Sequence, residues 1–196
     1  MKALIYDYET LSNKPTEAPV LTMALYRFDS ERFIDNPYTL DEIVRDAKFF
    51  KFNAREQIEK FDRKPNKDTI KWWMNKPKPV QDSQFKPLAT DISITNLVDI
   101  FFDNYVKDDL VFTRGNTFDP VITEAVLSVI DKDFTAHPFW VIRDTRSYIE
   151  GMAYGNNINN SFMPDGVGDI TDQLHDPRVD IALDVLRIQA LAKALS

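Results

Sequence analysis

The sequence predicts an α/β fold, a mixed central sheet flanked by helices. Three apolar segments in the first third of the chain have the length of β-strands, and two more in the second half alternate with segments of helical periodicity. Strands that alternate with helices favour a sheet covered by helices on its faces. The chain has 196 residues, of which 43% are hydrophobic, enough for one buried core. We therefore expect a single domain over residues 1–196.

The three N-terminal strands are expected to pair as an antiparallel meander. The first is the apolar run Lys2–Thr10, which ends in acidic residues. The second is Val20–Phe28, which follows a proline-bracketed turn, and the third is Ala47–Asn53, where the alternation is imperfect.

A basic helical insertion containing two tryptophans is predicted at about residues 53–90. Asn53 is placed to cap a short helix, because Glu56 follows in capping-box spacing. Asn66 is placed to cap a second helix that carries TIKWWMNK and ends before Pro77. The residues from Pro77 to Asp91 include three prolines and are expected to form a loop.

The second half is predicted to alternate helices with strands. Apolar residues from Ile94 to Tyr105 recur at helical spacing and mark an amphipathic helix. The elements expected after it are a strand at Leu110–Thr113, a helix at Pro120–Ile130, a strand at Pro138–Ile142, a helix at Thr145–Met152 and a helix from Pro177 to about Lys193.

Composition excludes several classes of site. The chain has no cysteine, which removes disulfides, thiolate zinc sites and cysteine nucleophiles. Its two histidines disfavour any site that needs several of them, and His137, which precedes a proline, is expected to be a loop residue. No segment has the features of a signal peptide or a membrane span, so we expect a cytoplasmic protein without a membrane partner, in the host cytoplasm if phage-encoded.

Charge is unevenly distributed along the chain. The formal net charge is −7, yet the segment from Arg45 to Lys86 has twelve basic and six acidic residues and carries +6, so the remainder carries −13. Such a chain can present a basic face to phosphates and concentrate carboxylates elsewhere. A solvated lysine-rich surface is the alternative interpretation.

Three sets of residues are candidates for chemistry. Asp7 and Glu9 end the first strand and share one of its faces, where two desolvated acids favour a bound cation, unless the strand simply ends in solvent. Asp119 begins a helix before Pro120, so that helix capping competes with a catalytic role.

His175 and Asp180 form the third set. Asp176 is placed to cap the last helix, which leaves Asp180 in the first turn and His175 in the preceding loop, so that both can reach one site. The alternative is a solvated polar stripe in which Asp184 pairs with Arg187. Four carboxylates without cysteine suit two Mg²⁺ or Mn²⁺ ions, which can activate a water against a phosphodiester while one histidine serves as base.

These residues resemble a known family in order and spacing. Asp7-x-Glu9, Asp119 within GNTFD, and His175 followed by Asp180 resemble the DEDDh class of 3′–5′ exonucleases, which have an RNase H-like fold. Within the class the chain is most similar to the phage DexA-type exonucleases and related short bacterial exoribonucleases. The resemblance spans nearly the whole chain through IYDYETLS, TIKWWMNK, FTRGNTFDPVI, IRDTRS and HDPRVDIALDVLRIQ.

The resemblance implies the roles of individual residues. Asp7, Glu9, Asp119 and Asp180 would bind two Mg²⁺ or Mn²⁺ ions, and His175 would be the base in releasing 5′-mononucleotides from a 3′ end. The residues expected to contact substrate are Thr10, Leu11, Trp72, Trp73, Asn116 and Phe118. Adjacent tryptophans on a helix point about 100° apart, so we expect one in the core and one over the cleft, where it can stack on a base. The alternative is that both lie in the core.

Two departures and several alternatives remain open. Pro177 and Arg178 stand where the family has small residues, and Arg178 can reach a phosphate or face solvent. The expected substrate is a single-stranded 3′ end, with DNA favoured over RNA through the phage resemblance, and the oligomeric state stays open with a dimer among the alternatives. The rival functions are a 3′–5′ exoribonuclease, a small-nucleotide phosphodiesterase and a catalytically silent nucleic-acid-binding module.

Overall fold

A five-stranded mixed sheet forms the centre of the protein. The computed structural model describes residues 1–154 and 158–195. The strands are β1 (Lys2–Thr10), β2 (Val20–Asp29), β3 (Lys48–Lys51), β4 (Leu110–Thr113) and β5 (Ile142–Asp144), in the spatial order β3-β2-β1-β4-β5. β1, β2 and β3 pair antiparallel, whereas β1, β4 and β5 pair parallel. The predicted mixed sheet, a meander extended by parallel strands, is therefore confirmed.

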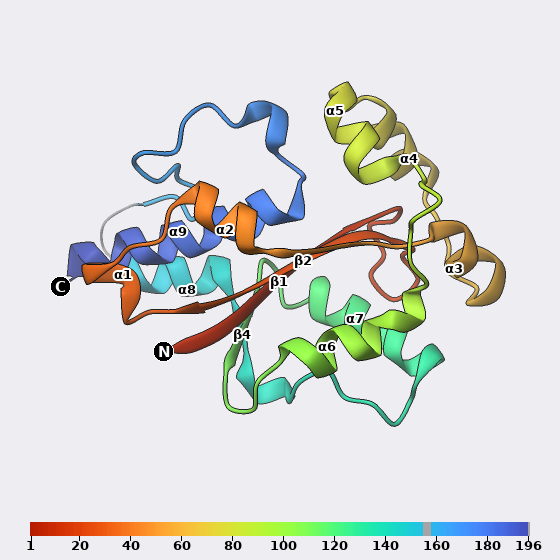
Figure 1. The fold of residues 1–196 in the computed structure, drawn as a ribbon, viewed down its shortest axis with the longest axis horizontal. Helices are drawn as coiled ribbons and strands as arrows, with labels where there is room; N and C mark the ends of the chain where they lie inside the picture. The colour runs from red at the N-terminus through yellow and green to blue at the C-terminus, as the bar shows by residue number, and fades with distance from the viewer. Residues whose placement is uncertain (155–157, 196) are drawn as a thin grey trace.

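Helices cover both faces of this sheet (Figure 1). One face carries α1 (Arg32–Asp35), α2 (Leu40–Asp46), α8 (Thr145–Met152) and α9 (Pro177–Leu195), and the other carries α6 (Leu97–Asn104) and α7 (Asp119–Ile130). The remaining helices are α3 (Ala54–Lys60), α4 (Lys67–Met74), α5 (Lys78–Val80), a π-helix η1 (Gln81–Phe85), and the 3₁₀ turns η2 (Ile94–Asn96), η3 (Phe139–Val141) and η4 (Thr171–Gln173). Within the described residues, no helix is long and apolar enough to cross a membrane.

The two faces of β1 have different partners. Leu4, Tyr6 and Tyr8 pack in the core cluster that includes residues of α6 and α7. Ala3 and Ile5 pack in the second cluster, with α8 and α9. Because side chains alternate along a strand, Asp7 and Glu9 continue the row of Ala3 and Ile5 and lie on the face covered by α9.

Helix α9 is buried on nearly all sides. Asp184 and Arg187 are 1% and 6% exposed, so the solvated polar stripe expected on this helix is wrong. Their ion pair, 2.8 Å between Arg187 Nη1 and Asp184 Oδ1, does form, but inside the protein. Burial of the stripe is possible because Arg114 and Thr145 also donate hydrogen bonds to the Asp184 carboxylate.

Hydrogen bonds join the insertion between β3 and η2 to the start of β2. Asn53 and Asn66 cap α3 and α4 as predicted, each accepting main-chain N–H bonds from the first turn. The buried Gln57 amide accepts from Val20 N and donates to Val20 O, at 2.8 and 2.7 Å. The stretch expected to be a loop after Pro77 contains α5 and η1 instead, with Gln84 accepting a bond from Thr22.

Other differences from the expected elements are local. The last strand begins at Ile142 rather than Pro138, because the intervening residues turn in η3 and leave Phe139 and Trp140 76% and 66% exposed. Helix α2 was not predicted, although Thr39 caps it by accepting from Glu42 N. Both differences concern segments too short for periodicity to identify.

Candidate active site

Two carboxylates meet where β1 ends beneath α9. Glu9 is 9% exposed and Asp7 is half-buried. Burial raises the pKa of Asp7 well above its usual value, and repulsion from Asp119 and Asp180 raises it further. Burial likewise raises the pKa of Glu9, again with repulsion from Asp180 and Asp119. The four acids predicted from the sequence are thus close enough to repel one another.

Asp119 is turned toward β1 rather than toward its own helix end. The N-cap position of α7 is Phe118, and Asp119 is the first helical residue. The Tyr8 main-chain N–H donates to Asp119 Oδ1 at 3.3 Å. The capping alternative for Asp119 is therefore wrong. Asp119 is 2% exposed, and burial raises its pKa to about 7.

A buried hydroxyl network fixes the first turn of α7 against β1. The hydroxyls of Tyr8 and Thr123 lie 3.0 Å apart, and Thr123 donates to Asp119 O at 3.1 Å. The Tyr6 hydroxyl joins this network and lies 3.1 Å from His137 Nε2. His137 is therefore a buried partner of Tyr6, in a loop as predicted.

His175 and Asp180 approach the same acids from the start of α9. Asp176 accepts a bond from Arg178 N at 3.0 Å, the capping role predicted for it. His175 precedes it with φ of 71°, in the left-handed region. His175 Nδ1 lies 3.8 Å from Glu9 Oε1. Burial, with repulsion from neighbouring acids, raises the pKa of Asp180 to about 7.

This donor set fits a divalent cation. One ligand atom each from Glu9, His175 and Asp180 lie within 4.8 Å of one another, and Asp7 and Asp119 adjoin them. Carboxylate oxygens are ligands that Mg²⁺ and Mn²⁺ prefer. Burial and mutual repulsion raise the pKa values of these acids, and a bound cation would offset both effects.

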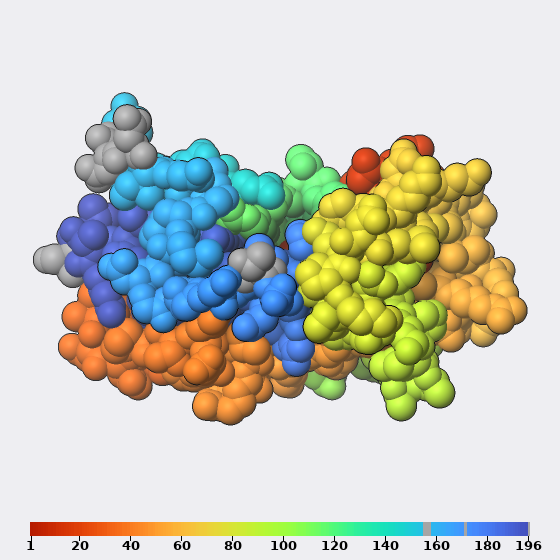
Figure 2. All heavy atoms as spheres, turned by 90° about the horizontal axis from the view of Figure 1, so that it is seen from above, coloured from red at the N-terminus to blue at the C-terminus, as the bar shows by residue number. Residues whose placement is uncertain are grey.

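Helix α4 of the insertion lies over the histidine. The Trp72 and His175 rings meet edge to face, with centroids 4.7 Å apart. Lys76 Nζ lies 3.7 Å from the centroid of the Trp72 ring and also interacts with Glu9 and Asp180. Burial, with the Lys76 charge, lowers the pKa of His175 to about 4, so the imidazole is neutral at neutral pH. Figure 2 shows the insertion, in yellow, against the blue segment that leads into α9.

The two tryptophans have separate environments, as expected. Trp73 is fully buried, stacks on Phe85 and donates from Nε1 to Thr10 O at 2.9 Å. Trp72 is 40% exposed. The alternative in which both tryptophans lie in the core is therefore wrong.

The other residues expected to contact substrate are unevenly accessible. Leu11 packs in a core cluster with Trp73, and the Thr10 hydroxyl donates to Ser12 O, so both side chains are engaged within the protein. Asn116 is exposed, and Phe118 packs partly into the core beside α7. Of this set, Trp72 and Asn116 are the most exposed.

Seven of the twelve basic residues in the segment Arg45–Lys86 form local ion pairs. Ion pairs join Arg45–Asp46, Arg55–Glu59, Lys60–Glu56, Lys64–Asp62, Lys71–Asp68, Lys78–Asp82 and Lys86–Asp82. Arg63 is buried and donates to main-chain carbonyls of the turn after β1. Arg178, left open by the sequence, folds back on Asp176 and lies over the Phe49 ring.

A fifth carboxylate, Asp184, lies behind the site, where the sequence pattern placed it in a solvated stripe of α9. Asp184 raises the pKa of Asp180 and accepts a bond from Arg114, which follows β4. A space of about 10 Å³, the size of one water, is lined by Asp7, Arg114, Asp180 and Asp184 among others. Asp184 stands four residues after Asp180, so helical spacing was the one signal that could have revealed it.

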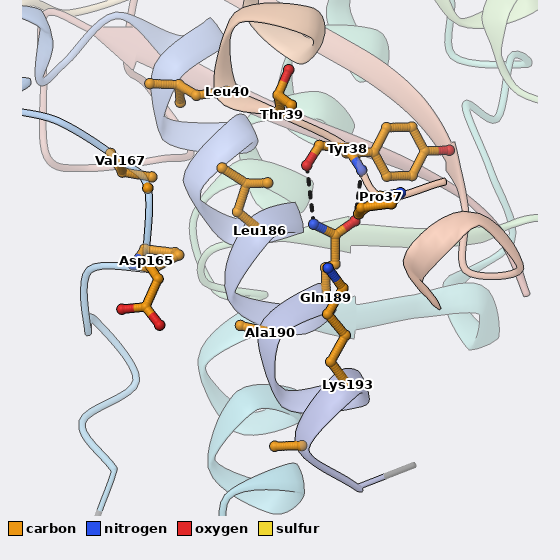
Figure 3. A pocket seen from close by; sticks show the side chains of 13 residues that line it. Pro37, Tyr38, Thr39, Leu40, Asp165, Val167, Leu186, Gln189, Ala190 and Lys193 are labelled. Carbon is orange, nitrogen blue, oxygen red and sulfur yellow. Dashed lines mark hydrogen bonds between the residues drawn. The ribbon is translucent and has the colours of Figure 1, made fainter. Parts of the chain in front are cut away.

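A larger cavity lies away from the acidic site. A cavity of about 580 Å³ lies along the second half of α9, between the α2 entry and residues 164–167 (Figure 3). There the Gln189 amide is engaged with the main chain of Tyr38 in both directions. None of the clustered acids lines this cavity, so the chemistry belongs to the acidic site.

Comparisons with solved structures identify the fold. E. coli exonuclease I in a zinc-bound complex with single-stranded DNA superposes with a TM-score of 0.62 at 15% identity, covering 98% of this chain and 40% of that one. E. coli exonuclease I with a dA16 oligonucleotide gives 0.65 at 16% identity, covering 98% and 41%. This chain thus spans about two fifths of their length and shares the RNase H-like fold. No curated protein sequence matches it.

The family comparison covers most of the sequence. Residues 2–179 match the Rv2179c-like 3′–5′ exoribonuclease domain. That range contains Asp7, Glu9, Asp119 and His175 and ends one residue before Asp180. With β1, β4, α7 and the start of α9 inside the matched region, the chain belongs to the Rv2179c-like 3′–5′ exoribonuclease domain family.

Proposed function

We propose that this protein is a metal-dependent 3′–5′ exonuclease of the DEDDh type, which hydrolyses nucleic-acid strands from the 3′ end to 5′-mononucleotides. The observation that carries the proposal is the convergence of Asp7, Glu9, Asp119 and Asp180 with His175 on the end of β1. Family membership supports degradation in the 3′ to 5′ direction. The particular similarity to DexA-type enzymes stays a prediction.

The four acids are the proposed ligands of two Mg²⁺ or Mn²⁺ ions. Bound there, such ions would activate a water and stabilise the leaving oxygen of the phosphodiester. Asp119 is fixed by the Tyr8 N–H and Asp180 by the first turn of α9, so both carboxylates are oriented before substrate arrives.

His175 is the proposed general base. Its lowered pKa keeps the ring able to accept a proton from the attacking water at neutral pH. The left-handed backbone at His175 and the Trp72 ring both restrain the imidazole. We therefore assign α4 a part in catalysis through Trp72.

The same helix is proposed to bind the substrate strand. An exposed tryptophan can stack on a base, but Lys76 covers one face of Trp72, so stacking on that face requires Lys76 to move. A displaced Lys76 is itself a candidate for contact with a substrate phosphate. Lys67 and Lys48, which have no ion pair among the described residues, are further candidates for backbone contacts.

The polymer is the open part of the proposal. The family is described as acting on RNA, and the exonuclease I structures contain single-stranded DNA. The preference for DNA expected from the sequence stays a prediction, with a 3′–5′ exoribonuclease as its rival. Selection depends on how the site treats a 2′-hydroxyl.

The test is degradation of 5′-labelled single-stranded and 3′-recessed DNA and RNA with Mg²⁺, Mn²⁺ or EDTA. We expect a ladder that shortens from the 3′ end with either metal and not with EDTA. The faster polymer identifies the substrate. Poor cleavage of long strands with good cleavage of dinucleotides would instead favour the small-nucleotide phosphodiesterase.

Two variants separate catalysis from binding. Asp7→Ala and His175→Ala should remove turnover while the circular dichroism spectrum stays that of the wild type. Retained turnover in purified Asp7→Ala protein would contradict the proposal. Salt-sensitive binding without any ladder, in the wild type, would indicate the silent binding module.

A further inference from the structure

Arg146 differs from every other arginine of the chain. All ten arginines lie in the described residues, and Arg146 alone has no hydrogen bond or ion pair there. The other nine, each with at least one polar partner, are Arg27, Arg32, Arg45, Arg55, Arg63, Arg114, Arg143, Arg178 and Arg187. Arg146 is also exposed, so its five N–H donors are available to a ligand.

The backbone that carries Arg146 is held rigidly beside the acidic site. Asp144 caps α8 by accepting from Ser147 N at 2.8 Å, and its other oxygen accepts from Asn116 N at 3.2 Å. Thr145 donates to the buried Asp184 carboxylate. The first turn of α8 is thereby tied both to the turn before Asp119 and to α9.

The turn before Asp119 leaves room for the guanidinium. Gly115 has φ of +140°, and a Cβ added there would lie 3.3 Å from Arg146 Nη1. Arg146 therefore lies across the Gly115 backbone, four residues before Asp119. Its charge lowers the pKa of Asp119, yet no carboxylate of the described chain lies within ion-pair distance. The guanidinium is thus close to the site but separate from the proposed metal ligands.

We propose that Arg146 binds a phosphate of the substrate strand next to the one that is cleaved. This inference rests on the proposed function, because it assigns the neighbouring subsite of the same reaction. A planar guanidinium with two free N–H edges matches a phosphate in bidentate geometry. Arg114, the other arginine at this turn, cannot take the role, since Asp184, Asn160 and Ser161 already accept its hydrogen bonds.

The experiment compares Arg146→Ala and Arg146→Lys with Lys132→Ala, which removes one exposed charge at the far end of α7. Three probes are used with each protein. A 5′-labelled single strand of the preferred polymer gives kcat and KM, the p-nitrophenyl ester of thymidine 5′-phosphate reports on the scissile phosphate alone, and fluorescence anisotropy of the strand in Ca²⁺ gives Kd.

For Arg146→Ala we expect kcat/KM on the strand to fall about tenfold, mainly through KM, since a charge-assisted hydrogen bond is lost. Kd should rise to a similar extent, and the slope of log Kd against log salt should decrease by about 0.7. Hydrolysis of the nitrophenyl ester should be unchanged. Arg146→Lys should recover part of the loss, and Lys132→Ala should match the wild type.

Unchanged kcat/KM and Kd on the strand in Arg146→Ala would overturn the inference while leaving the exonuclease intact. An equal loss on the nitrophenyl ester would also overturn it, because the effect would then be on the reacting centre. A wild type that degrades no strand would contradict the proposed function instead, and the Kd comparison would still decide the role of Arg146.

Discussion

At the scale of residues, the site is built from acids that repel one another. Burial raises the pKa of Asp7, and repulsion from Asp119, Asp180 and Glu9 raises it further. Removal of one charge should therefore reduce the repulsion among the remaining acids. A cluster of this kind lowers the stability of the metal-free protein and is retained at functional sites.

Asp7→Asn should therefore lose exonuclease activity and gain stability. In EDTA at about pH 8 the variant should melt at a higher temperature than the wild type, by about 2–4 °C for each kcal/mol of repulsion relieved. Thermal unfolding followed by circular dichroism measures this. Asp133→Asn, an exposed acid outside the cluster, is the matched control. An Asp7→Asn protein that melts lower than the wild type would contradict the account of mutual repulsion.

At the scale of elements, one tryptophan of the insertion packs in the core and the other contacts the candidate active site. Trp73 is in a core cluster with Leu11, Leu21 and Val80. Its Nε1 donates a hydrogen bond to Thr10 O at the end of β1. Trp72 is half-exposed and meets His175. The two adjacent residues should thus separate stability from activity.

Trp73→Ala should cost about 3–5 kcal/mol in the free energy of unfolding, because it opens a cavity and leaves the Thr10 carbonyl unpaired. Trp72→Ala should cost about 1 kcal/mol or less and should lower kcat, since the imidazole loses its neighbour. Urea unfolding and initial rates on a single strand measure the two effects. Equal destabilisation by both substitutions would contradict the separation of a structural role for Trp73 from a catalytic role for Trp72.

Sequence patterns predicted those elements whose local residue pattern is distinctive. Buried strands, asparagine caps and the α9 start at Asp176 and Pro177 could be identified because each depends on neighbouring residues alone. The burial of Asp184 and the orientation of Asp119 toward Tyr8 could not, because their partners are distant in sequence. Arg146 was missed for the same reason: its position depends on Gly115 in another turn.

At the scale of the whole molecule, the acidic site couples folding to pH. The folded-state pKa values of Asp119 and Asp180 are raised to about 7, above the ordinary value near 4. The folded state then binds protons more tightly than the unfolded chain, so this stabilisation is complete below about pH 4 and is lost as the pH rises through about 7.

The metal-free protein should therefore lose stability between about pH 6 and pH 8. This window lies above the range in which His137 and His175, each with a pKa lowered to about 4, contribute. Mn²⁺ should restore stability most at the higher pH, where the ligands are ionised. Melting temperatures in EDTA and in Mn²⁺ across this range test both statements. Asp180→Asn should flatten the EDTA profile. Rising stability toward pH 8 in EDTA would contradict the assignment.

The most direct test of the four-carboxylate site is the activity of Asp119→Asn. The asparagine keeps an oxygen that can accept the Tyr8 N–H bond, so the fold of the α7 start is retained while one charge is removed. On a single strand labelled at its 3′-terminal nucleotide, with Mn²⁺, the wild type should release labelled 5′-mononucleotide and the variant should be slower by about a hundredfold or more. A variant that keeps the wild-type rate would contradict the claim that Asp119 completes a metal-dependent exonuclease site.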